Sequence, residues 1–300
     1  MVLSYQEPYL QIFDHPVFNV AGIEVSVLRE DLNHPFVSGN KWWKLRDNLS
    51  AAKNSGLPVV TFGGAYSNHI FATAAACKEL GLRCYGIIRG DDGHTDSPTL
   101  VFARNCGMIL HRVSREQYRN KTHFEFIEHL KSQVGGFYLV PEGGSNSLAV
   151  RACADWGRKI LNQYGQQFDA LALPVGTGGT MGGLIAGFNG KKIIHGFSVL
   201  KNGAFLTEQI NAFLKDRSSE QSNSWKLHTE YHFGGYGKPN DDVFSFIKNQ
   251  QSVLPLDVVY TAKMLLGIID LAKKGIFERG YRLLAIHTGG LQGNRGFGLG

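Results

Sequence analysis

The 300-residue chain is predicted to have an α/β fold, in which a parallel sheet is covered by helices on both faces. Two observations predict this class. Apolar segments of strand length alternate with helical segments of 10–18 residues, and polar, glycine-rich loops recur where the predicted strands end. A hydrophobic content of 43% and a charged content of 19% are typical of a globular protein, and the length suits one large or two modest domains.

The first half of the chain alternates regularly between strands and helices. It opens with IEVSVLR, whose residues alternate in character as in a strand. Gly56 and Gly81 close two helices, because glycine readily adopts the left-handed conformation that ends a helix. The predicted elements are strand 23–29, helix 42–55, strand 57–63, helix 70–80, strand 84–88, helix 99–106, strand 108–113, helix 116–133 and strand 137–140.

The second half continues the alternation less regularly. The apolar run LALPV is typical of a buried strand, and LIAGF, which follows the next loop, can start a helix. A mixed segment that reaches about residue 230 gives no clear pattern. The predicted elements are helix 148–164, strand 169–175, strand 192–199, helix 241–250, helix 260–274 and strand 283–287.

The loop GTGGT has the composition of an anion-binding site. Between a strand and a helix N-terminus, Gly176, Gly178 and Gly179 let backbone N–H groups approach a phosphate, and Thr177 and Thr180 add hydroxyl donors. A tight turn without a ligand is the alternative. No lysine follows the last glycine and the glycine spacing is not G-x-G-x-x-G, so a phosphate-bearing ligand other than a nucleotide is favoured.

Four polar loops follow predicted strands, and together they indicate an active site. Ligands of open α/β sheets bind at the carboxyl ends of the strands, where such loops converge. One cleft lined by all four is therefore expected. The loops are GGAYSNH (63–69), PEGGSNS (141–147), GTGGT (176–180) and HTGG (287–290).

Charge and composition exclude or disfavour several other classes. The net charge is +6, but the basic residues are scattered, which favours attraction of a small anion over nucleic-acid binding. No apolar run approaches the ~20 residues of a membrane span, and no signal peptide is recognised, so a cytoplasmic protein without a membrane partner is expected. The cysteines show no zinc or disulfide pattern and are expected to be buried or partly buried thiols: Cys77, Cys84, Cys106 and Cys153. No metal site is expected.

Seven motifs in order resemble a known family. The chain is similar, over about residues 25–290, to the pyridoxal-phosphate (PLP) enzymes grouped as 1-aminocyclopropane-1-carboxylate deaminase and D-cysteine desulfhydrase. The resemblance implies the tryptophan-synthase-β-like fold type II, with two open, twisted, mostly parallel sheets flanked by helices. It also implies a homodimer, a large domain of residues 1–47 and 151–300, and a small inserted domain of residues 48–150. The motifs are SGNKWWKL (38–45), GGAYSNH, PEGGSN, GTGGT, YGKPN (236–240), VVYTAK (258–263) and HTGG.

The resemblance implies roles for residues around the cofactor. Lys41 would form the internal aldimine with PLP and move protons at the substrate Cα, and Lys44 is the rival lysine. The 176–180 loop would hold the cofactor phosphate. Asn68 would bind the phenolic oxygen, and Ser67 would lie near the substrate carboxylate or act in catalysis. His69, beside them in the substrate site, is either a proton relay or a packed imidazole, with packing slightly favoured.

The remaining motif residues bear on the substrate and the reaction. Tyr236 would stack near the pyridine ring and contact substrate, and Tyr260 would do acid/base work there if its pKa is lowered. Thr288 would face the pyridine nitrogen, and Thr261 stands where ring-opening deaminases have glutamate. A hydroxyl makes a shallower electron sink than a carboxylate would, and this suffices for β-elimination.

The expected reaction is therefore loss of thiol, or of another β-substituent, from D-cysteine or a related small amino acid, giving pyruvate and ammonia. Ring-opening deamination and serine/threonine-type dehydration are alternatives on the same fold. A non-catalytic PLP- or phosphometabolite-binding protein is the alternative of a different class. Trp43 and Arg46 replace the family's usual Arg and Glu, which predicts a rewired ion pair or aromatic packing close to the cleft.

Overall fold

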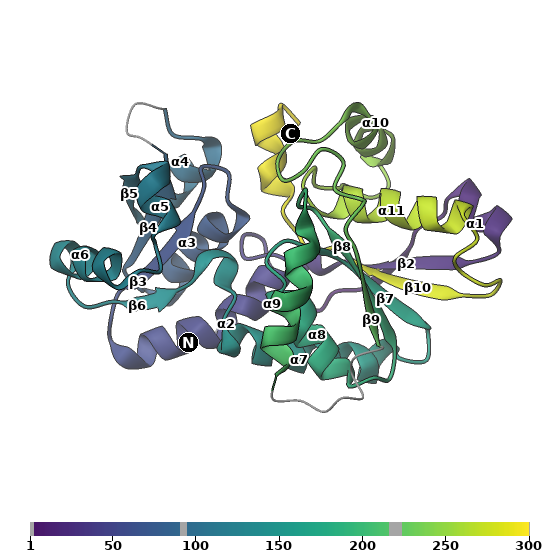
Figure 1. Cartoon of the computed structure of the whole chain (residues 1–300), viewed down its shortest axis with the longest axis horizontal. Coiled ribbons are helices and arrows are strands. Elements are labelled where there is room, and N and C mark those ends of the chain that lie inside the picture. Colours follow the sequence, from purple (N-terminus) through teal and green to yellow (C-terminus); the bar gives the residue numbers. More distant parts are fainter. Residues whose placement is uncertain (1–2, 91–94, 216–223, 300) are drawn as a thin grey trace.

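Two separate sheets organise the computed structural model, which describes residues 3–90, 95–215 and 224–299 (Figure 1). One sheet has six strands in the order β1-β2-β10-β7-β8-β9, and the other has four in the order β5-β4-β3-β6. All neighbouring strands are parallel except the pair β1–β2 at one edge. The predicted fold class, two mostly parallel sheets flanked by helices, is confirmed.

The four-stranded sheet is built from a continuous part of the chain. Its neighbouring strands β3 and β4 pair from Val59 with Cys84 to Gly63 with Ile88, so their carboxyl ends lie side by side. The elements are β3 (Val59–Gly63), α3 (Asn68–Leu80), β4 (Cys84–Arg89), α4 (Pro98–Asn105), β5 (Ile109–Val113), α5 (Arg115–Arg119), α6 (Phe124–Val134) and β6 (Tyr138–Val140).

Helices cover both faces of this small sheet because the strand residues alternate between two apolar surroundings. Val60, Phe62 and Ile87 pack with residues of α5 and α6. Val59 and Ile88 belong to the larger apolar cluster that includes α3 and α4. Burying each such side chain stabilises the fold by about 1.5–3 kcal/mol, so a sheet with two apolar faces needs a helix layer on each.

The six-stranded sheet joins the two ends of the chain. Its elements are β1 (Leu10–Ile12), α1 (Pro16–Ala21), β2 (Glu24–Leu28), α7 (Ser147–Tyr164), β7 (Ala170–Val175), α8 (Gly179–Phe188), β8 (Ile193–Ser198), α9 (Leu206–Leu214), β9 (Trp225–His228), α10 (Asp241–Gln250), α11 (Thr261–Lys273) and β10 (Arg282–Ile286). Along β7, Leu171 and Leu173 face the core of α7 and α8, while Ala170 and Ala172 face that of α10 and α11.

Glycines bring α7 and α8 into backbone contact and thereby fix the position of the α8 N-terminus. A Cβ atom on Gly183 would overlap Cys153, and one on Gly187 would overlap the Ala154 carbonyl. Both partners belong to α7, so the two helices pack closely only because these positions carry no side chain. The helix that follows the glycine loop therefore has little freedom to shift.

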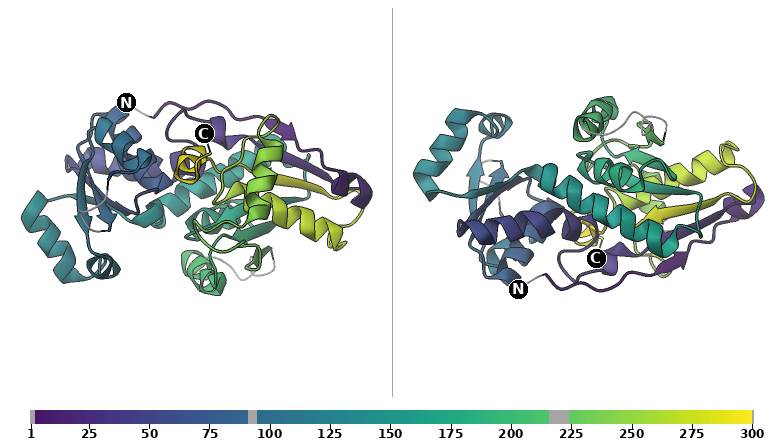
Figure 2. Two further views of the ribbon diagram at one scale, coloured as in Figure 1. Left: turned by 90° about the horizontal axis from the view of Figure 1, so that it is seen from above. Right: turned by 90° about the horizontal axis from the view of Figure 1, so that it is seen from below.

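The helix α2 (Asn40–Ser55) runs from one sheet toward the other and packs on α7 (Figure 1). The domain boundaries predicted at residues 48 and 150 fall inside α2 and α7, and they stay predictions. A 3₁₀ helix at Leu291–Phe297, here called the C-terminal segment, lies between the two sheets in all three views (Figure 2). A Cβ on Gly296 would meet the Tyr66 ring at 2.6 Å, so this segment touches the loop after β3.

Several elements differ from the sequence-based prediction or were not predicted. The helix predicted at 116–133 is two helices, because α5 ends at Arg119 and α6 begins only at Phe124. The helix predicted at 70–80 begins at Asn68, with Ser67 as its N-cap. Elements β1, α1, α9, β9 and the C-terminal segment were not predicted, since each is short or lacks a clear period. Within the described ranges, no helix is both long and apolar enough to cross a membrane.

Candidate active site

Two lysines, the half-buried Lys41 and the buried Lys44, project from the first turns of α2. Lys41 and Lys44 are three residues apart and so share one face of the helix. The preceding Gly39 has φ +67°, and a Cβ there would overlap the carbonyl of Thr288. Only glycine permits this approach, which places the HTGG loop directly beside the lysine motif.

The Lys41 amine lies at the seam between α2 and α8. Its Nζ donates to Oδ1 of Asn40 at 3.1 Å, and Nδ2 of Asn40 donates to the Thr180 hydroxyl at 2.9 Å. Burial lowers the pKa of Lys41 to about 8, and the nearby Cys153 and Asp257 oppose this shift. A substantial fraction of the amine is therefore neutral near physiological pH, as a nucleophilic lysine requires.

The Lys44 amine lies deeper, among hydroxyl groups. Its side chain is 2% exposed, and Nζ donates to the Ser145 hydroxyl at 2.7 Å and lies 3.5 Å from that of Thr177. Burial lowers the pKa of Lys44 to about 7, and the charge of Lys41 adds to the effect. None of the ion pairs between described residues involves Lys44, so this cation is buried without an anion beside it.

The donors around Lys44 fit a phosphate group. Gly178 has φ +74° and precedes α8, whose first-turn N–H groups have no partner within the helix. The hydroxyls of Ser145 and Thr177 are 2.6 Å apart beside this helix end, and a Cβ on Gly179 would meet the Ser145 hydroxyl at 2.7 Å. Backbone donors, two hydroxyls and a buried ammonium form a site for a compact anion, and no described carboxylate pairs with the ammonium.

The loop between β3 and α3 carries Ser67 and Asn68. The Ser67 hydroxyl caps α3 by accepting from the Ile70 N–H at 3.3 Å. Oδ1 of Asn68 accepts a hydrogen bond from Nε2 of Gln292 at 2.9 Å. This bond leaves the Asn68 amide NH₂ as the group available to an acceptor, and a Cβ on Gly290 would come within 2.5 Å of it. The C-terminal segment thus orients Asn68.

His69 is packed behind the loop. The ring is 2% exposed, and its Nε2 lies 2.7 Å from the Thr61 hydroxyl, which itself donates to the carbonyl of Val140 at 2.8 Å. Because the Thr61 proton is thus used, His69 must donate from Nε2, and Nδ1 is the unprotonated nitrogen. Burial, together with the charges of Lys41 and Lys44, lowers the pKa of His69, so the ring is neutral.

Two tyrosines face each other at the other side of the site. The Tyr236 and Tyr260 rings are edge to face with centroids 6.1 Å apart, and their hydroxyls are 3.5 Å apart. The Asp257 carboxylate accepts from the backbone N–H of Tyr260 at 2.7 Å and so fixes the start of α11. Burial raises the pKa of Tyr260, and the neighbouring phenol adds to this. Acid/base work by Tyr260 was predicted to need a lowered pKa. The pKa is raised instead, so this phenol keeps its proton.

The two threonines of interest lie at the base of the site. Thr288 is 6% exposed and directly precedes the glycine pair that approaches Ser38 and Asn68. Thr261 begins α11, and its buried hydroxyl has no partner among the described residues. A buried hydroxyl without a hydrogen bond is uncommon.

The altered lysine motif is compensated by aromatic packing and a new ion pair. Trp43 stacks on Trp156, with centroids 5.6 Å apart and planes 8° apart, and both indoles donate to the buried carboxylate of Glu30. Arg46 pairs with Asp155 at 2.7 Å and lies over the Trp43 ring. Both predicted outcomes, aromatic packing and a rewired ion pair, are therefore present, on the side of α2 that faces away from the lysines.

Most of the predicted site residues lie close together in the structure. Some of them, such as Ser67 and His69, also form hydrogen bonds that stabilise the fold. Lys41 is linked to Thr180 through Asn40, and Thr177 lies with Lys44 and Ser145 in a second group of hydrogen bonds. Tyr260 lies 3.3 Å from where Gly176 would carry a Cβ. The sequence analysis missed Asn40, Ser145, Asp257 and Gln292. The first two lie inside motifs already noted, whereas Asp257 and Gln292 carry no signal in their local sequence.

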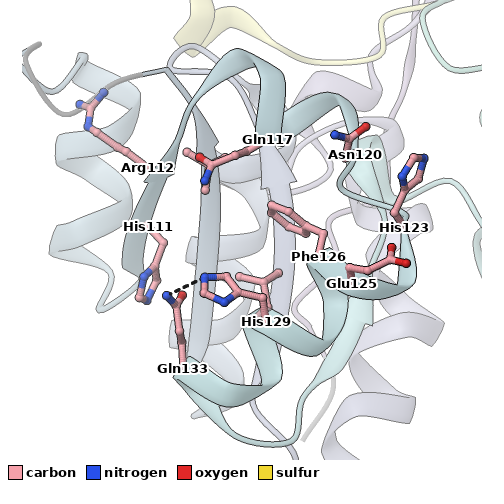
Figure 3. A pocket seen from close by; sticks show the side chains of 11 residues that line it. His111, Arg112, Gln117, Asn120, His123, Glu125, Phe126, His129 and Gln133 are labelled. Atoms are coloured by element: carbon pink, nitrogen blue, oxygen red, sulfur yellow. Dashed lines mark hydrogen bonds between the residues drawn. The ribbon is translucent and has the colours of Figure 1, made fainter.

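A cavity elsewhere does not belong to this site. It measures about 460 Å³ and lies between β5, α5 and α6, where His111, His129 and Gln133 line it (Figure 3). None of its lining residues is a lysine, so it cannot bind an aldehyde covalently. Its imidazoles do not form a metal site either, because the described residues contain no group of three or more His, Cys, Asp or Glu placed to hold an ion.

Comparisons with known proteins agree with this geometry. The family described as pyridoxal-phosphate dependent enzyme matches residues 11–289. A Pyrococcus horikoshii protein, named only provisionally as a 1-aminocyclopropane-1-carboxylate deaminase, is 30% identical over 92% of this chain and 87% of its own length. The mitochondrial bifunctional D-cysteine desulfhydrase/1-aminocyclopropane-1-carboxylate deaminase of Arabidopsis thaliana is 29% identical over 91% of this chain and 73% of its own.

A solved structure gives the same result in three dimensions. The crystal structure of a 1-aminocyclopropane-1-carboxylate deaminase homologue superimposes with a TM-score of 0.85 at 29% identity, and it covers 99% of this chain and 93% of its own.

Proposed function

The chain belongs to the pyridoxal-phosphate-dependent enzyme family, and we propose that it releases a β-substituent from a small amino acid, with D-cysteine or a close relative as the substrate. The predicted family and cofactor are thereby confirmed, at the level of an enzyme of 1-aminocyclopropane-1-carboxylate deaminase and D-cysteine desulfhydrase type. The substrate and the residue roles below are the proposal.

The separation of the two lysines is the observation that supports these roles. Lys44 lies among the hydroxyls at the α8 N-terminus, where it would bind the cofactor phosphate. Lys41 lies one turn away, bonded only to Asn40, with a pKa of about 8. It would therefore bind the cofactor aldehyde and then take the proton from the substrate Cα.

The remaining residues would hold the cofactor and substrate in place. Bound pyridoxal phosphate supplies an aldehyde for the amine and a ring that withdraws electrons from the substrate Cα. Asn68, oriented by Gln292, would donate to the phenolic oxygen, and Thr288 would face the ring nitrogen. Ser67 and the N–H groups at the start of α3 would hold the substrate carboxylate. His69 would support this loop from behind, and Tyr236 would cover the ring.

Tyr260 would serve as a proton donor. Because burial raises the pKa of its phenol, it is suited to donating a proton or a hydrogen bond to a departing group and unsuited to acting as the base. Loss of thiol from D-cysteine gives hydrogen sulfide and an unsaturated amine, which water converts to pyruvate and ammonia. In this assignment Lys41 takes the Cα proton and Tyr260 assists the leaving sulfur.

Threonines at the two motif positions near the expected ring nitrogen favour β-elimination over ring opening. Thr261 and Thr288 are the motif residues at this side of the site, and neither can keep the nitrogen protonated as a carboxylate would. 1-Aminocyclopropane-1-carboxylate deamination is the second candidate, because the relatives above carry that name in whole or in part. A dehydratase, and a PLP-binding protein without turnover, are the further alternatives.

Absorption spectra of the purified protein test the proposal. D-cysteine, L-cysteine and 1-aminocyclopropane-1-carboxylate are added in turn, and pyruvate or a related keto acid is measured. A cofactor band that changes with D-cysteine, together with pyruvate and sulfide, supports the elimination. Turnover of the cyclopropane substrate alone would favour the second candidate, and binding without any product would favour a non-catalytic protein.

The assembly proposed for this enzyme is a homodimer with an inserted small domain of residues 48–150. Sedimentation of the cofactor-loaded protein measures the first property. Limited proteolysis near both boundaries measures the second, since a compact insert should resist cleavage internally.

A further inference from the structure

An arginine lies beside the loop that forms part of the proposed substrate site. Arg89 is the last residue of β4, and the β3–β4 register puts it beside the loop that follows Gly63. One of its guanidinium nitrogens lies 3.7 Å from where a Cβ of Gly64 would be. Gly64 begins the GAYSNH part of the loop, so this cation lies against the segment proposed to bind the substrate carboxylate.

No described side chain forms an ion pair with Arg89. No side-chain hydrogen bond between described residues involves it either, and its guanidinium lies 5.7 Å from the centre of the Tyr118 ring. Glu142 is a carboxylate in this region, because its charge, like that of Arg89, affects the pKa of the Tyr118 phenol. Glu142 forms its ion pair with Lys121, at 3.3 Å. An exposed guanidinium that rests on an aromatic ring keeps its donors available to a ligand.

The charge of Arg89 also acts on the tyrosine at the other side of the site. Burial raises the pKa of Tyr236, and the positive charge of Arg89 opposes that rise. The arginine thus lies against the 63–69 loop, and its charge reaches Tyr236. If the first turn of α3 holds the α-carboxylate, then Arg89 meets a group farther along the substrate side chain.

We propose that Arg89 forms a subsite for a second anionic group, so that amino acids whose side chain ends in a carboxylate, sulfonate or phosphate bind more tightly than neutral ones. This inference rests on the proposed function, because it assumes that an amino acid binds at the 63–69 loop. A planar guanidinium binds such groups through two parallel hydrogen bonds. Neutral amino acids of the same size would lack this contact.

Calorimetric titration of the cofactor-loaded protein tests the subsite without turnover. The ligands are aspartate and glutamate, each against its amide, in both enantiomers. An acid and its amide differ only in the charge of the distal group, and none carries a good leaving group. The wild type should bind at least one acid about tenfold or more tightly than its amide.

Two variants localise the effect. Arg89→Gln should abolish the preference for the acid and leave the affinity for the amide within about threefold. Arg83→Gln is the matched control, because Arg83 is exposed at the opposite end of the same strand, and the preference should survive there. Equal weakening of acid and amide by Arg89→Gln would overturn the subsite, since Arg89 would then bind the shared α-carboxylate or support the loop.

The outcome is separable from that of the proposed function. A wild type that eliminates thiol from D-cysteine but shows no preference for acids refutes the subsite alone. A protein that prefers acids, loses the preference in Arg89→Gln and releases no pyruvate refutes the proposed elimination and keeps the subsite.

Discussion

The two faces of α2 each bury an ionisable group, but they satisfy it differently. On one face Lys44 lies beside the hydroxyls of Ser145 and Thr177, and it forms no ion pair with a described carboxylate. On the other face Glu30 accepts from Nε1 of Trp43, Nε1 of Trp156 and Nδ2 of Asn33 at 3.3, 2.7 and 2.6 Å. The carboxylate accepts from three donors, whereas the ammonium has neutral hydroxyl oxygens as its acceptors.

This difference separates a structural site from a binding site. Protein donors complete the Glu30 cluster, so it needs nothing from solution. The Lys44 cluster contains a buried cation, two hydroxyls and the N-terminus of α8. A bound phosphate would accept hydrogen bonds from all of these groups. Burial shifts the two pKa values in opposite directions, raising that of Glu30 to about 7 and lowering that of Lys44 to about 7. The contributions of the two groups to the unfolding free energy should therefore change in opposite directions with pH.

The largest expected effect is on catalysis, from the lysine face. Lys41→Ala should lower kcat/KM by about a thousandfold or more, because the variant lacks both the amine for the cofactor and the base for Cα. Steady-state kinetics with the best substrate measure this. Lys53→Ala, an exposed lysine near the end of the same helix, should have wild-type kinetics. If Lys44→Ala is inactive and Lys41→Ala is active, Lys44 binds the cofactor aldehyde and the assignment of the two lysines is wrong.

The second effect is on the stability of the cofactor-free protein. The folded pKa of Lys44 lies below its unfolded value of about 10.5, so the unfolded chain binds more protons between pH 7 and 10. The unfolding free energy should therefore rise with pH in this window, with Lys44 contributing about 3 kcal/mol. Urea denaturation at several pH values measures the unfolding free energy. The rise with pH should be smaller by this amount in Lys44→Met and unchanged in Lys53→Met.

Lys44→Met should also weaken cofactor binding by about 10- to 100-fold, because one charge-assisted bond to the phosphate is lost. Fluorescence titration with pyridoxal phosphate measures this, and free phosphate should stabilise the wild type more than the variant. Unchanged affinity would place the phosphate elsewhere.

A smaller effect of opposite sign is expected from the tryptophan face. The folded pKa of Glu30 lies above its unfolded value of about 4.5, so the folded protein binds more protons between pH 4.5 and 7. The contribution of Glu30 should be fully present below pH 4.5 and should be lost as pH rises through 7, a change of about 2 kcal/mol. Urea denaturation of Glu30→Gln should lack this decline, and that of Glu24→Gln, an exposed control, should keep it.

The smallest effect is expected where the C-terminal segment meets the site. Gln292→Ala should weaken cofactor binding by about fivefold, since Asn68 loses one neutral hydrogen bond. Gln292→Glu keeps the size of the side chain, but a carboxylate can only accept a hydrogen bond. The Asn68 amide should therefore rotate so that its NH₂ group donates to the introduced carboxylate and its carbonyl oxygen points toward the cofactor. A larger change in the cofactor absorption band for Glu than for Ala would support this orientation. Equal spectra would contradict it.

How far the sequence predicted the molecule depends on whether a feature is local. The strands β3, β4 and β7 and the GTGGT loop were predicted, because apolar runs and glycine–hydroxyl clusters are local patterns. Gln292 contacts Asn68 across 224 positions, and Glu30 contacts Trp156 across 126, so no local pattern could indicate either pair. The helix predicted at 116–133 was divided by tertiary packing, which propensity alone does not determine.

The most direct test of the central claim locates the lysine that binds the cofactor. Borohydride reduction makes the bond between pyridoxal phosphate and the protein permanent, and peptide mass spectrometry then identifies the modified residue. The structure predicts modification of Lys41, with Lys44 unmodified. Modification of Lys44, or of neither lysine in protein saturated with the cofactor, would contradict the assignment of the two lysines on which the proposed function depends.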